Sequence, residues 1–441
     1  MIGRDKAPTA QETFAQMAQA AGLRGRLLVT VGLLILVRLG VYLPVPGIDR
    51  QAFAANVKNS PLIGLLDLFS GGGIVALGIF ALGILPFINA SIIMQLLTAA
   101  LPSLEKLQKD EGEAGRRKIS QVSRYVALGW AVLQSIGIAI WVSPFAETSN
   151  PGFFFYAKIV IALSAGSMFV MWVSELITER GVGNGASLLI FLNIVSVLPK
   201  SLGATIAQAQ TTIEQNPTGG REFVGRVIVL LIVFLVTIIG IVFVQEATRR
   251  IPIVSARRQV GRKMYLEKSS YLPLRLNQGG VMPIIFASAV LFLPASLANF
   301  IQNETLSKIA ATYLNPGSFV YVATYLVLIL FFSYFYASLI VNPVDLSQNL
   351  KKMGSSIPGI RPGKATSEYV ERVLNRLTFL GAVFLGAVAI IPTAVESATN
   401  VSTFRGLGAT SLLILVGVAI DTSKQIQTYV ISQRYEGMVK Q

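Results

Sequence analysis

The sequence is dominated by uncharged stretches that are long enough to cross a lipid bilayer. Residues 276–303, 317–341 and 125–146 contain no Asp, Glu, Lys or Arg. A membrane-spanning helix needs about 20 mostly apolar residues, and these stretches meet that length. Charged residues make up 13% of the 441-residue chain, about half of the roughly 25% that is typical of soluble globular proteins. These features exclude an ordinary soluble fold and predict an all-α polytopic membrane protein.

Ten segments of the chain fit this description. The first requires that Arg38 is tolerated inside the membrane. The second is part of an uncharged run over residues 68–104, which three consecutive glycines and Pro86 interrupt. We predict ten transmembrane helices, at residues 27–43, 74–101, 125–146, 153–174, 181–199, 227–244, 276–303, 317–341, 377–395 and 406–420.

The distribution of basic residues predicts the side of the membrane on which each end of the chain lies. If the N-terminus is cytosolic, 28 of the 37 Lys and Arg residues fall on the cytosolic side and eight on the opposite side. Cytosolic loops of membrane proteins carry such an excess of positive charge. We therefore expect cytosolic tails at residues 1–26 and 424–441. The start of the chain is polar and does not resemble a cleaved signal peptide.

Short sequence matches recur in the two halves of the chain. Residues 86–91 read P-F-I-N-A-S and residues 283–288 read P-I-I-F-A-S, while S-L-L-I occurs at both 187–190 and 411–414. A Gly-Arg pair also opens the first and the sixth predicted spans. Apolar segments share Leu, Ile and Ala freely, so each match alone could arise by chance. Matches in the same order favour an internal duplication of five spans.

The duplication predicts two halves of opposite orientation, because five spans is an odd number. We expect the halves at residues 27–202 and 221–423, joined by an external polar linker at 203–220. In inverted-repeat folds the functional path lies near the membrane midplane, between the repeats. The second and seventh spans carry the matched prolines and are the best candidates to line it.

The matched segments place isoleucines at corresponding positions of the two halves. Ile88 and Ile285 are repeat partners, and so are Ile190 and Ile414. For any one isoleucine, contact with lipid or packing in the core is the simpler explanation. The symmetry favours a shared role, because isoleucines around one axis would form a dry constriction that blocks water and ions. The candidates are Ile84, Ile88, Ile190, Ile194, Ile285 and Ile414.

The residue types at hand limit the chemistry that the chain can perform. There is no Cys and no His, which removes thiol chemistry, the commonest metal ligand and the commonest general base. No carboxylate lies inside a predicted span, whereas ion-coupled transporters usually keep some there. We predict no catalytic residue, metal or cofactor. A passive polypeptide channel fits best, a secondary transporter with inverted repeats is the alternative, and an intramembrane enzyme fits least.

A short apolar segment, residues 61–70, lies between the first two spans on the external side. It is too short to span the membrane, and backbone at membrane depth must be buried in protein or line a cavity. We expect a short helix folded into the external mouth, followed by flexible glycines; an interfacial helix lying on lipid is the alternative. The residues concerned are Leu62, Ile63, Leu65, Leu66, Leu68, Phe69, Gly71 and Gly72.

Two large loops are predicted on the cytosolic side, at residues 248–275 and 344–376. The first holds eight cations against Glu267, and the second contains S-S-I-P-G-I-R-P-G, in which Pro and Gly restrict the backbone around one arginine. Membrane topology and anionic lipid account for the charge. The length and the scaffold favour docking of an acidic protein or of RNA phosphate. The candidate docking residues are Arg257, Arg258, Arg262, Lys263 and Arg361.

Six motifs in this sequence resemble those of the SecY family, the central subunit of the bacterial and plastid protein-translocation channel. The resemblance covers essentially the whole chain. The motifs are P-V-P-G-I-D at 44–49, D-L-F-S-G-G at 67–72, F-A-L-G-I-L-P at 80–86, T-E-R-G-V-G-N-G at 178–185, L-P-L-R at 272–275 and I-P-G-I-R-P-G at 357–363.

The resemblance implies two five-helix halves that open like a clam, with a lateral gate between the second and seventh spans. It implies that residues 61–70 form a plug, that the six isoleucines form the pore ring, and that Arg361 is the family's functional arginine. The gate residues it implies are Pro86, Ser91, Gln95, Pro283 and Ser288.

The resemblance also implies partners and a location. SecE would clamp the channel, SecG would lie at its side, and a SecA motor or a translating ribosome would dock on the cytosolic loops. Client polypeptides would carry signal sequences, and anionic lipid would surround the channel, which would act as one copy or as a dimer. The membrane would be the plasma membrane, and also the thylakoid membrane in cells that have one. No phosphate-binding Gly-Lys-Ser/Thr motif occurs, so energy must come from a partner.

Overall fold

The computed structural model describes residues 21–57, 70–147, 152–215, 217–255, 259–260, 263–264, 269–301, 318–399 and 409–439. Most of these residues are helical. The helices are α2 (Ala21–Gly40), α3 (Arg50–Val57), α5 (Leu85–Ala100), α6 (Pro102–Asp110), α7 (Gly112–Val142), α8 (Phe153–Arg180), α9 (Gly185–Gln215), α10 (Pro217–Glu246), α11 (Met282–Ile301), α13 (Phe319–Ile340), α14 (Pro343–Lys352), α15 (Lys364–Thr399) and α16 (Ala409–Val439), with a short 3-10 turn at Ser143–Phe145.

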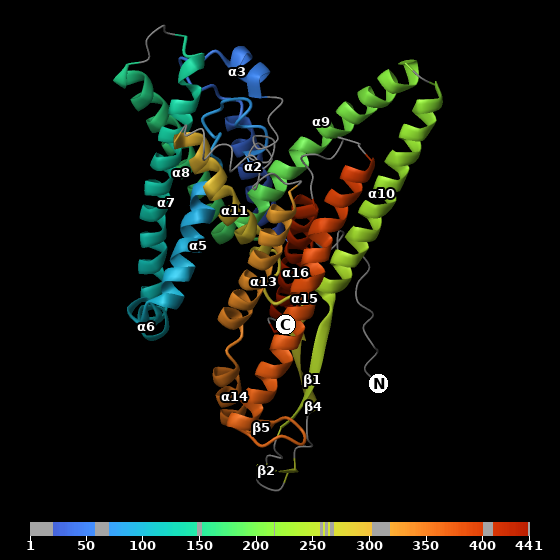
Figure 1. Ribbon diagram of the computed structural model, residues 1–441. Coiled ribbons are helices and arrows are strands. Elements are labelled where there is room, and N and C mark those ends of the chain that lie inside the picture. The colour runs from blue at the N-terminus through green and yellow to red at the C-terminus, as the bar shows by residue number, and fades with distance from the viewer. Residues whose placement is uncertain are drawn as a thin grey trace.

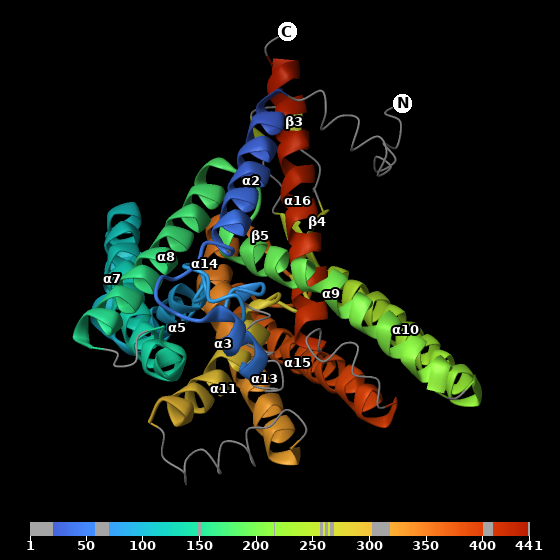
Figure 2. The ribbon, with the colours of Figure 1, turned by 90° about the horizontal axis from the view of Figure 1, so that it is seen from above.

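The long helices form two groups that meet at a seam. Helices α2, α5, α7 and α8 pack together on one side, and α10, α13, α15 and α16 pack together on the other (Figure 1). Helix α9 contacts α8, α10 and α16, while α11 contacts α5, α7, α13 and α16. Seen from above, α2 lies beside α16, although they are at opposite ends of the chain (Figure 2). Helices α9 and α11 therefore contact both groups, and α2 and α16 also meet directly.

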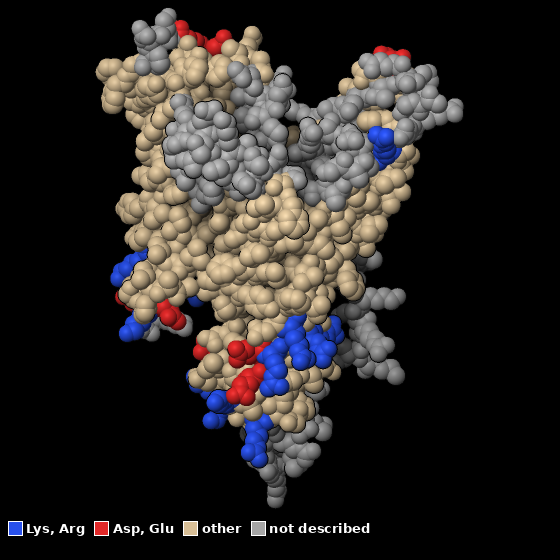
Figure 3. Space-filling model, in the orientation of Figure 1, with Lys and Arg blue, Asp and Glu red and all other residues tan. Residues whose placement is uncertain are grey.

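Five of the described helical stretches are long and apolar enough to cross a membrane. They are Gly112–Phe145, Phe153–Arg180, Phe223–Glu246, Phe319–Lys352 and Lys364–Ile391, and shorter apolar helices cover Leu85–Ala100, Gly185–Pro199 and Met282–Leu291. Each predicted span overlaps one described helix. Figure 3 shows a broad band of uncharged surface across the middle of one face, with Lys and Arg gathered toward its lower end. The molecule is thus a helical membrane protein, and the count of ten spans stays a prediction.

The second predicted span differs from the structure at its start. Residues 70–84 form a series of turns, and helix begins at Leu85. The prediction of one helical span over 74–101 is therefore wrong in its first part. Leu77 and Gly83 have φ values of 44° and 53°, in the left-handed region that breaks a right-handed helix. Pro86 then stands in the first turn of α5, a position that suits proline.

Neighbouring elements supply hydrogen bonds to this non-helical segment, which we call the 70–84 segment. The Val45 N–H donates to the Leu77 carbonyl at 3.1 Å, and the Ile79 N–H donates to the Leu43 carbonyl at 2.9 Å. The Ser167 hydroxyl of α8 donates to the Gly83 carbonyl at 3.1 Å. Polar backbone at membrane depth must find partners inside the protein, and these contacts provide them.

The stretch predicted as an external linker is mostly helix. Helix α9 continues to Gln215 and α10 begins at Pro217, so the two form a long pair that projects beyond the rest of the molecule at the upper right of Figure 1. The sequence of 203–215 is rich in Ala and Gln, which favour helix even without an apolar face. Polarity indicates that a segment leaves the membrane, but it does not indicate that the helix ends there.

The two predicted cytosolic loops meet in one small antiparallel sheet. Strand β1 (Thr248–Ser255) pairs with β4 (Ser269–Arg275) from Thr248 opposite Arg275 to Val254 opposite Ser269. It also pairs with β5 (Ser355–Ser356) of the second loop. Between β1 and β4 along the chain, two strands of two residues each, β2 (Gln259–Val260) and β3 (Lys263–Met264), pair with each other in an antiparallel manner. The sheet was not predicted, although Ile251 and Ile253 alternate with Arg250 and Pro252 as strand residues do.

Gly166 is a position where the fold leaves no room for a side chain. A Cβ atom there would lie 2.2 Å from the Ile79 carbonyl oxygen of the 70–84 segment. We expect Gly166→Ala to lower the free energy of unfolding by about 1–3 kcal/mol, because overpacking forces backbone to move. The measurement is the thermal unfolding midpoint of the purified protein in mild detergent.

Gly129 of α7 provides the matched control, because it is helical and a Cβ there would meet nothing within 4 Å. Gly129→Ala should leave the midpoint unchanged or raise it slightly, since alanine favours helix over glycine by roughly 0.5–1 kcal/mol. Equal midpoints for the two variants would show that α8 does not pack tightly on the 70–84 segment.

Candidate functional site

The six predicted ring isoleucines all lie in one large buried hydrophobic cluster of the structure. Ile84 and Ile88 lie at the start of α5, Ile190 and Ile194 on α9, Ile285 on α11 and Ile414 on α16. All six are buried, with exposed fractions between 0% and 6%, and all belong to one hydrophobic cluster. None of them faces lipid, which removes that alternative. Core packing is the remaining alternative, because the cluster holds other apolar residues as well.

The fully buried side chains around this cluster are apolar or neutral. Among the described residues, the buried polar side chains are all uncharged Ser, Thr, Asn and Gln. The described part of the chain also contains no group of three or more acidic residues that could hold a metal ion. An apolar constriction without fixed charges blocks ions because they would lose their hydration there. This arrangement suits a barrier better than an ion-binding site.

A cavity of about 680 Å³ lies next to the isoleucine cluster. Its lining includes Ser187, Val281 and Val418. Each of these residues is about one helical turn from a cluster isoleucine, namely Ile190, Ile285 and Ile414 respectively. Val281 and Val418 also belong to the hydrophobic cluster, so the cavity, which we call the vestibule, borders that cluster.

The outer part of this vestibule carries charged groups from several elements. Arg275, Asp421 and Lys424 line it, and the Lys424 ammonium lies 2.8 Å from a carboxylate oxygen of Glu246. Burial raises the pKa of the Asp421 carboxyl above its usual value, although Arg275 and Lys424 oppose that effect. Glu246 and Arg275 stand at the ends of α10 and β4, whereas Asp421 and Lys424 lie on α16, about two and three turns beyond Ile414.

The five predicted gate residues lie on α5 and α11. Pro86 and Pro283 occupy the first turns of these helices. The Ser288 hydroxyl donates within α11 to the carbonyls of Ile284 and Ile285, both at 2.9 Å, and Ser91 is half-buried on α5. Helices α5 and α11 are in contact with each other.

Gln95 is a predicted gate residue that makes a tertiary hydrogen bond. Its Oε1 accepts from the Tyr336 hydroxyl of α13 at 2.6 Å. The Tyr336 ring packs on Phe286 of α11 with centroids 5.1 Å apart, so α11 and α13 are linked on one side of the seam and α5 stands on the other. Tyr336 was not predicted from the sequence. It is one of four tyrosines in the apolar stretch 317–341, and nothing in the sequence indicates which of them bonds to a residue 241 positions away.

The predicted plug residues Leu62, Ile63, Leu65, Leu66, Leu68 and Phe69 lie outside the described residues. Gly71 and Gly72, which follow them, have φ values of 66° and 90°. That left-handed backbone favours glycine. Of the predicted docking residues, Arg257, Arg258 and Arg262 also lie outside the described residues, and Lys263 is in β3.

Arg361 lies at the tip of a turn that several hydrogen bonds hold. Its carbonyl accepts from the Thr366 hydroxyl at 2.9 Å, and the Ser347 hydroxyl donates to the Gly363 carbonyl at 2.7 Å. Gly359 and Gly363 have φ values of 78° and 107°. Under the turn, Ile357 packs with Ile251 and Leu274 of the sheet and with Val370 and Leu374 of α15. The side chain of Arg361 is exposed, so a rigid scaffold presents it to solvent.

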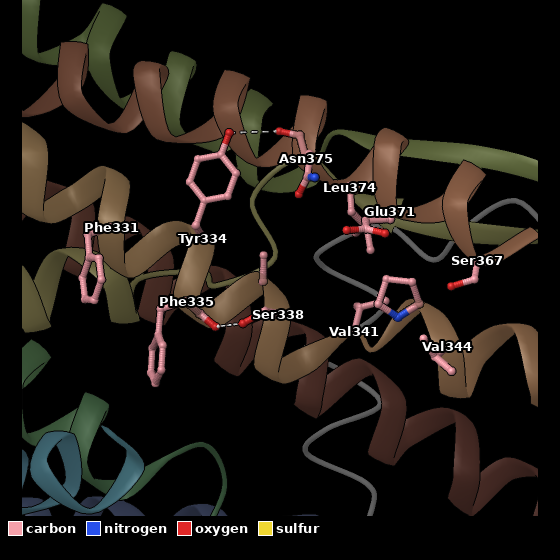
Figure 4. A pocket seen from close by; sticks show the side chains of 12 residues that line it. Phe331, Tyr334, Phe335, Ser338, Val341, Val344, Ser367, Glu371, Leu374 and Asn375 are labelled. Atoms are coloured by element: carbon pink, nitrogen blue, oxygen red, sulfur yellow. Dashed lines mark hydrogen bonds between the residues drawn. The ribbon is translucent and has the colours of Figure 1, made fainter. Parts of the chain in front are cut away.

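A second cavity, of about 660 Å³, lies between α13, α14 and α15. Figure 4 shows Tyr334 of α13 pointing toward Asn375 of α15, whose carbonyl accepts from the Tyr334 hydroxyl at 3.4 Å, while Phe331 and Phe335 of α13 point the other way. The lining of this second cavity includes none of the predicted site residues.

Comparison with known proteins gives a consistent result. The model of the family described as SecY matches residues 78–423. Proteins named "Protein translocase subunit SecY" are 69% identical in Synechococcus elongatus and 67% identical in Synechocystis, each over the full length of both chains. A chloroplastic relative from Spinacia oleracea, "Preprotein translocase subunit SECY", is 45% identical over 94% of this chain and 74% of its own.

Solved structures share the fold at much lower identity. "The structure of a protein conducting channel" aligns with a TM-score of 0.65 at 16% identity, covering 97% of this chain and 95% of that one. A second structure, titled for the SecY plug domain, aligns with a TM-score of 0.62 at 15% identity, covering 97% and 95%. The family model covers most of the chain, and the relatives from Synechococcus elongatus and Synechocystis cover all of it. The chain belongs to the SecY family.

Proposed function

We propose that this chain is the pore-forming subunit of a protein-translocation channel, which passes unfolded secretory polypeptides across a membrane. The observation that carries the proposal is the convergence of Ile84, Ile88, Ile190, Ile194, Ile285 and Ile414 in one buried apolar cluster beside a vestibule. An apolar barrier excludes ions, yet it can part for a larger chain because no specific bond must be broken. The names of its close relatives support the same function.

The proposal includes ten spans in two inverted halves, with the isoleucines as the pore ring between them. The sequence repeat supports the halves, and α9 and α11, which link the two groups of helices, both carry ring residues. Residues 61–70 act as an external plug in this proposal, on the evidence of the sequence. A secondary transporter is the alternative, but no carboxylate lies inside a predicted span to support it. No catalytic activity is part of the proposal.

We expect the ring to be the seal of the closed channel. Replacing Ile88 and Ile285 together by Ser should wet the constriction and raise ion leak about tenfold or more, because hydroxyl groups hold water where isoleucine excludes it. The measurement is ion flux across lipid vesicles that contain the purified chain.

The control makes the same Ile→Ser substitutions at two buried positions away from the ring. Ile138 on α7 and Ile159 on α8 are buried in a separate apolar cluster. The double variant Ile138→Ser/Ile159→Ser also replaces two isoleucine side chains by serine, and its ion leak should equal that of the wild type. If both double variants leak alike, general loosening explains the flux, and the ring proposal fails.

We propose that membrane segments leave sideways where α5 separates from α11 and α13. The hydrogen bond from Tyr336 to Gln95 crosses that seam, and the ring contacts of Phe286 with Phe332 and Tyr336 tie α11 to α13. Opening of the seam would therefore break the Tyr336–Gln95 bond and leave the aromatic contacts intact.

Removing the hydroxyl of Tyr336 should make this gate easier to open. A neutral hydrogen bond contributes about 1 kcal/mol, so Tyr336→Phe should shift the closed-to-open ratio roughly fivefold toward open. Single-channel recording in planar bilayers measures the open probability. Tyr334→Phe is the matched control, because Tyr334 bonds to α15 and not across the seam. An open probability that rises only in the control would refute the gate.

We propose that partners dock on the cytosolic sheet and on the Arg361 turn. Two of the similar solved structures are described as ribosome complexes of related channels, and a SecA motor would use the same face here. SecE and SecG would be the small membrane subunits, and anionic lipid and a second copy are further contacts to test. The cyanobacterial and chloroplast relatives support the plasma membrane and the thylakoid membrane as locations, with both ends of the chain in the cytosol.

Arg361→Glu should abolish partner-driven transport and leave the fold intact. The turn is held through the Arg361 carbonyl, so the backbone does not depend on the side chain. Export of a client into vesicles, driven by the motor, should fall by at least about tenfold, while Arg361→Lys should be intermediate because an ammonium cannot pair in a bidentate way.

Lys364→Glu is the matched control for bulk charge. Lys364 is 93% exposed and makes a loose pair with Glu368 at 3.9 Å, so its reversal should cost little. Copurification of the small membrane subunits should be normal in all three variants. Equal damage from Lys364→Glu and Arg361→Glu would mean that the face needs only positive charge.

A further inference from the structure

Arg38 is a charged residue at membrane depth to which the proposed channel gives no role. It lies in the last turn of α2, among apolar residues. An ionisable side chain inside a span is costly and marks a functional position. The side chain is half-buried, so neighbouring groups must satisfy part of its hydrogen-bonding capacity.

The guanidinium of Arg38 binds neutral groups. Its Nη1 donates to the Gly71 carbonyl, and its Nη2 donates to the Tyr42 hydroxyl at 3.2 Å. It also lies over the Tyr42 ring, 5.3 Å from the centroid. A planar guanidinium can donate in two directions and stack on an aromatic face at once, which an ammonium cannot do. Arg38 therefore fastens the start of the 70–84 segment to α2.

Gly71 lies in a narrow space between the side chains of Arg38 and of Asn193 on α9. A Cβ on Gly71 would lie 2.6 Å from the Asn193 Oδ1 and 2.9 Å from the Arg38 Nη1. Asn193 is buried on α9 and directly precedes the ring residue Ile194. The backbone at Gly71 is thus pressed between the arginine of α2 and the helix that carries two ring isoleucines.

The far part of the 70–84 segment is held in another way. Residues 77–79 pair with residues 43–45 through backbone hydrogen bonds, and Arg50 of α3 donates to the Ala76 carbonyl at 3.0 Å. Loss of Arg50 would leave that backbone pairing in place. Loss of Arg38 would remove a side-chain contact at the point where the segment touches α9.

We propose that Arg38 is a positioning residue for the pore constriction. It holds Gly71 against Asn193, and through that contact it holds Ile194 in the ring. The proposal rests on the pore function of the six isoleucines. Without Arg38, α9 loses a support beside Ile194, the constriction closes less tightly, and clients with weak signal sequences open it more readily.

The test compares Arg38→Gln, Arg38→Lys and Arg50→Gln with the wild type in lipid vesicles. Two quantities are measured: ion leak in the absence of client, and the ratio of export of a client with a defective signal sequence to export of the same client with an intact one. Arg38→Gln should raise both about tenfold, the factor that matches one charge-assisted hydrogen bond. Arg38→Lys should fall between Arg38→Gln and the wild type, since it keeps the charge but not the fork of donors.

Arg50→Gln is the matched control, because it removes an arginine-to-carbonyl contact on the same segment, away from α9. It should match the wild type in leak and in the export ratio. Wild-type values in Arg38→Gln would overturn the proposal, and so would equal rises in Arg38→Gln and Arg50→Gln, which would show general loosening.

Two further outcomes are separated by design. If Arg38→Gln does not accumulate in the membrane, Arg38→Lys decides: a leak above the wild type supports the proposal, and a wild-type leak overturns it. If the wild type exports no client at all, the proposed channel function fails. The ion leak of Arg38→Lys relative to Arg50→Gln then still reports whether Arg38 supports the constriction.

Discussion

The structure depends on how the non-helical 70–84 segment satisfies its backbone inside a membrane protein. Lipid offers no hydrogen-bond partners, so each exposed carbonyl at that depth is costly. Here the donors come from neighbouring elements: Arg38 of α2, Arg50 of α3 and Ser167 of α8. Gly166 lets α8 approach the Ile79 carbonyl closely. This set of contacts fixes where α5 begins, and with it the positions of Ile84 and Ile88.

In the proposed channel, closing the isoleucine ring and opening it would place opposite demands on the same residues. Buried isoleucines give tight closure through many weak contacts, each of which can slide. A salt bridge across the pore would be more specific, but it would also offer charge to ions and resist a passing chain. The seam between α5 and α11 follows the same logic, because Tyr336 and Gln95 provide one neutral hydrogen bond there. In the proposed channel the barrier would be dry, and it would separate without losing an ion pair.

Much of this arrangement could be predicted from the sequence, and the rest could not, for physical reasons. Apolar length located the helices, and the S-L-L-I and P-x-I-x-A-S repeats located isoleucines that the structure buries together. The break before Leu85 was missed, because an uncharged stretch looks the same whether it is helical or is held by distant donors such as Arg38. The sheet of β1, β4 and β5 was not predicted, because residues 248–275 were interpreted only as a positively charged loop. The strand-like alternation at Ile251 and Ile253 lies within that loop.

The cytosolic scaffold and the ring are connected through the second group of helices. Ile357, under the Arg361 turn, packs on Ile251 of β1 and on Val370 of α15, and β1 follows α10 directly along the chain. A force applied at Arg361 therefore reaches α10 and α15, which pack with α16 and its Ile414. Helix α5, with Ile84 and Ile88, belongs to the other group. Because packed elements move as units and do not deform continuously, a push on the turn should displace one group against the other and loosen the seam that α11 shares with α5.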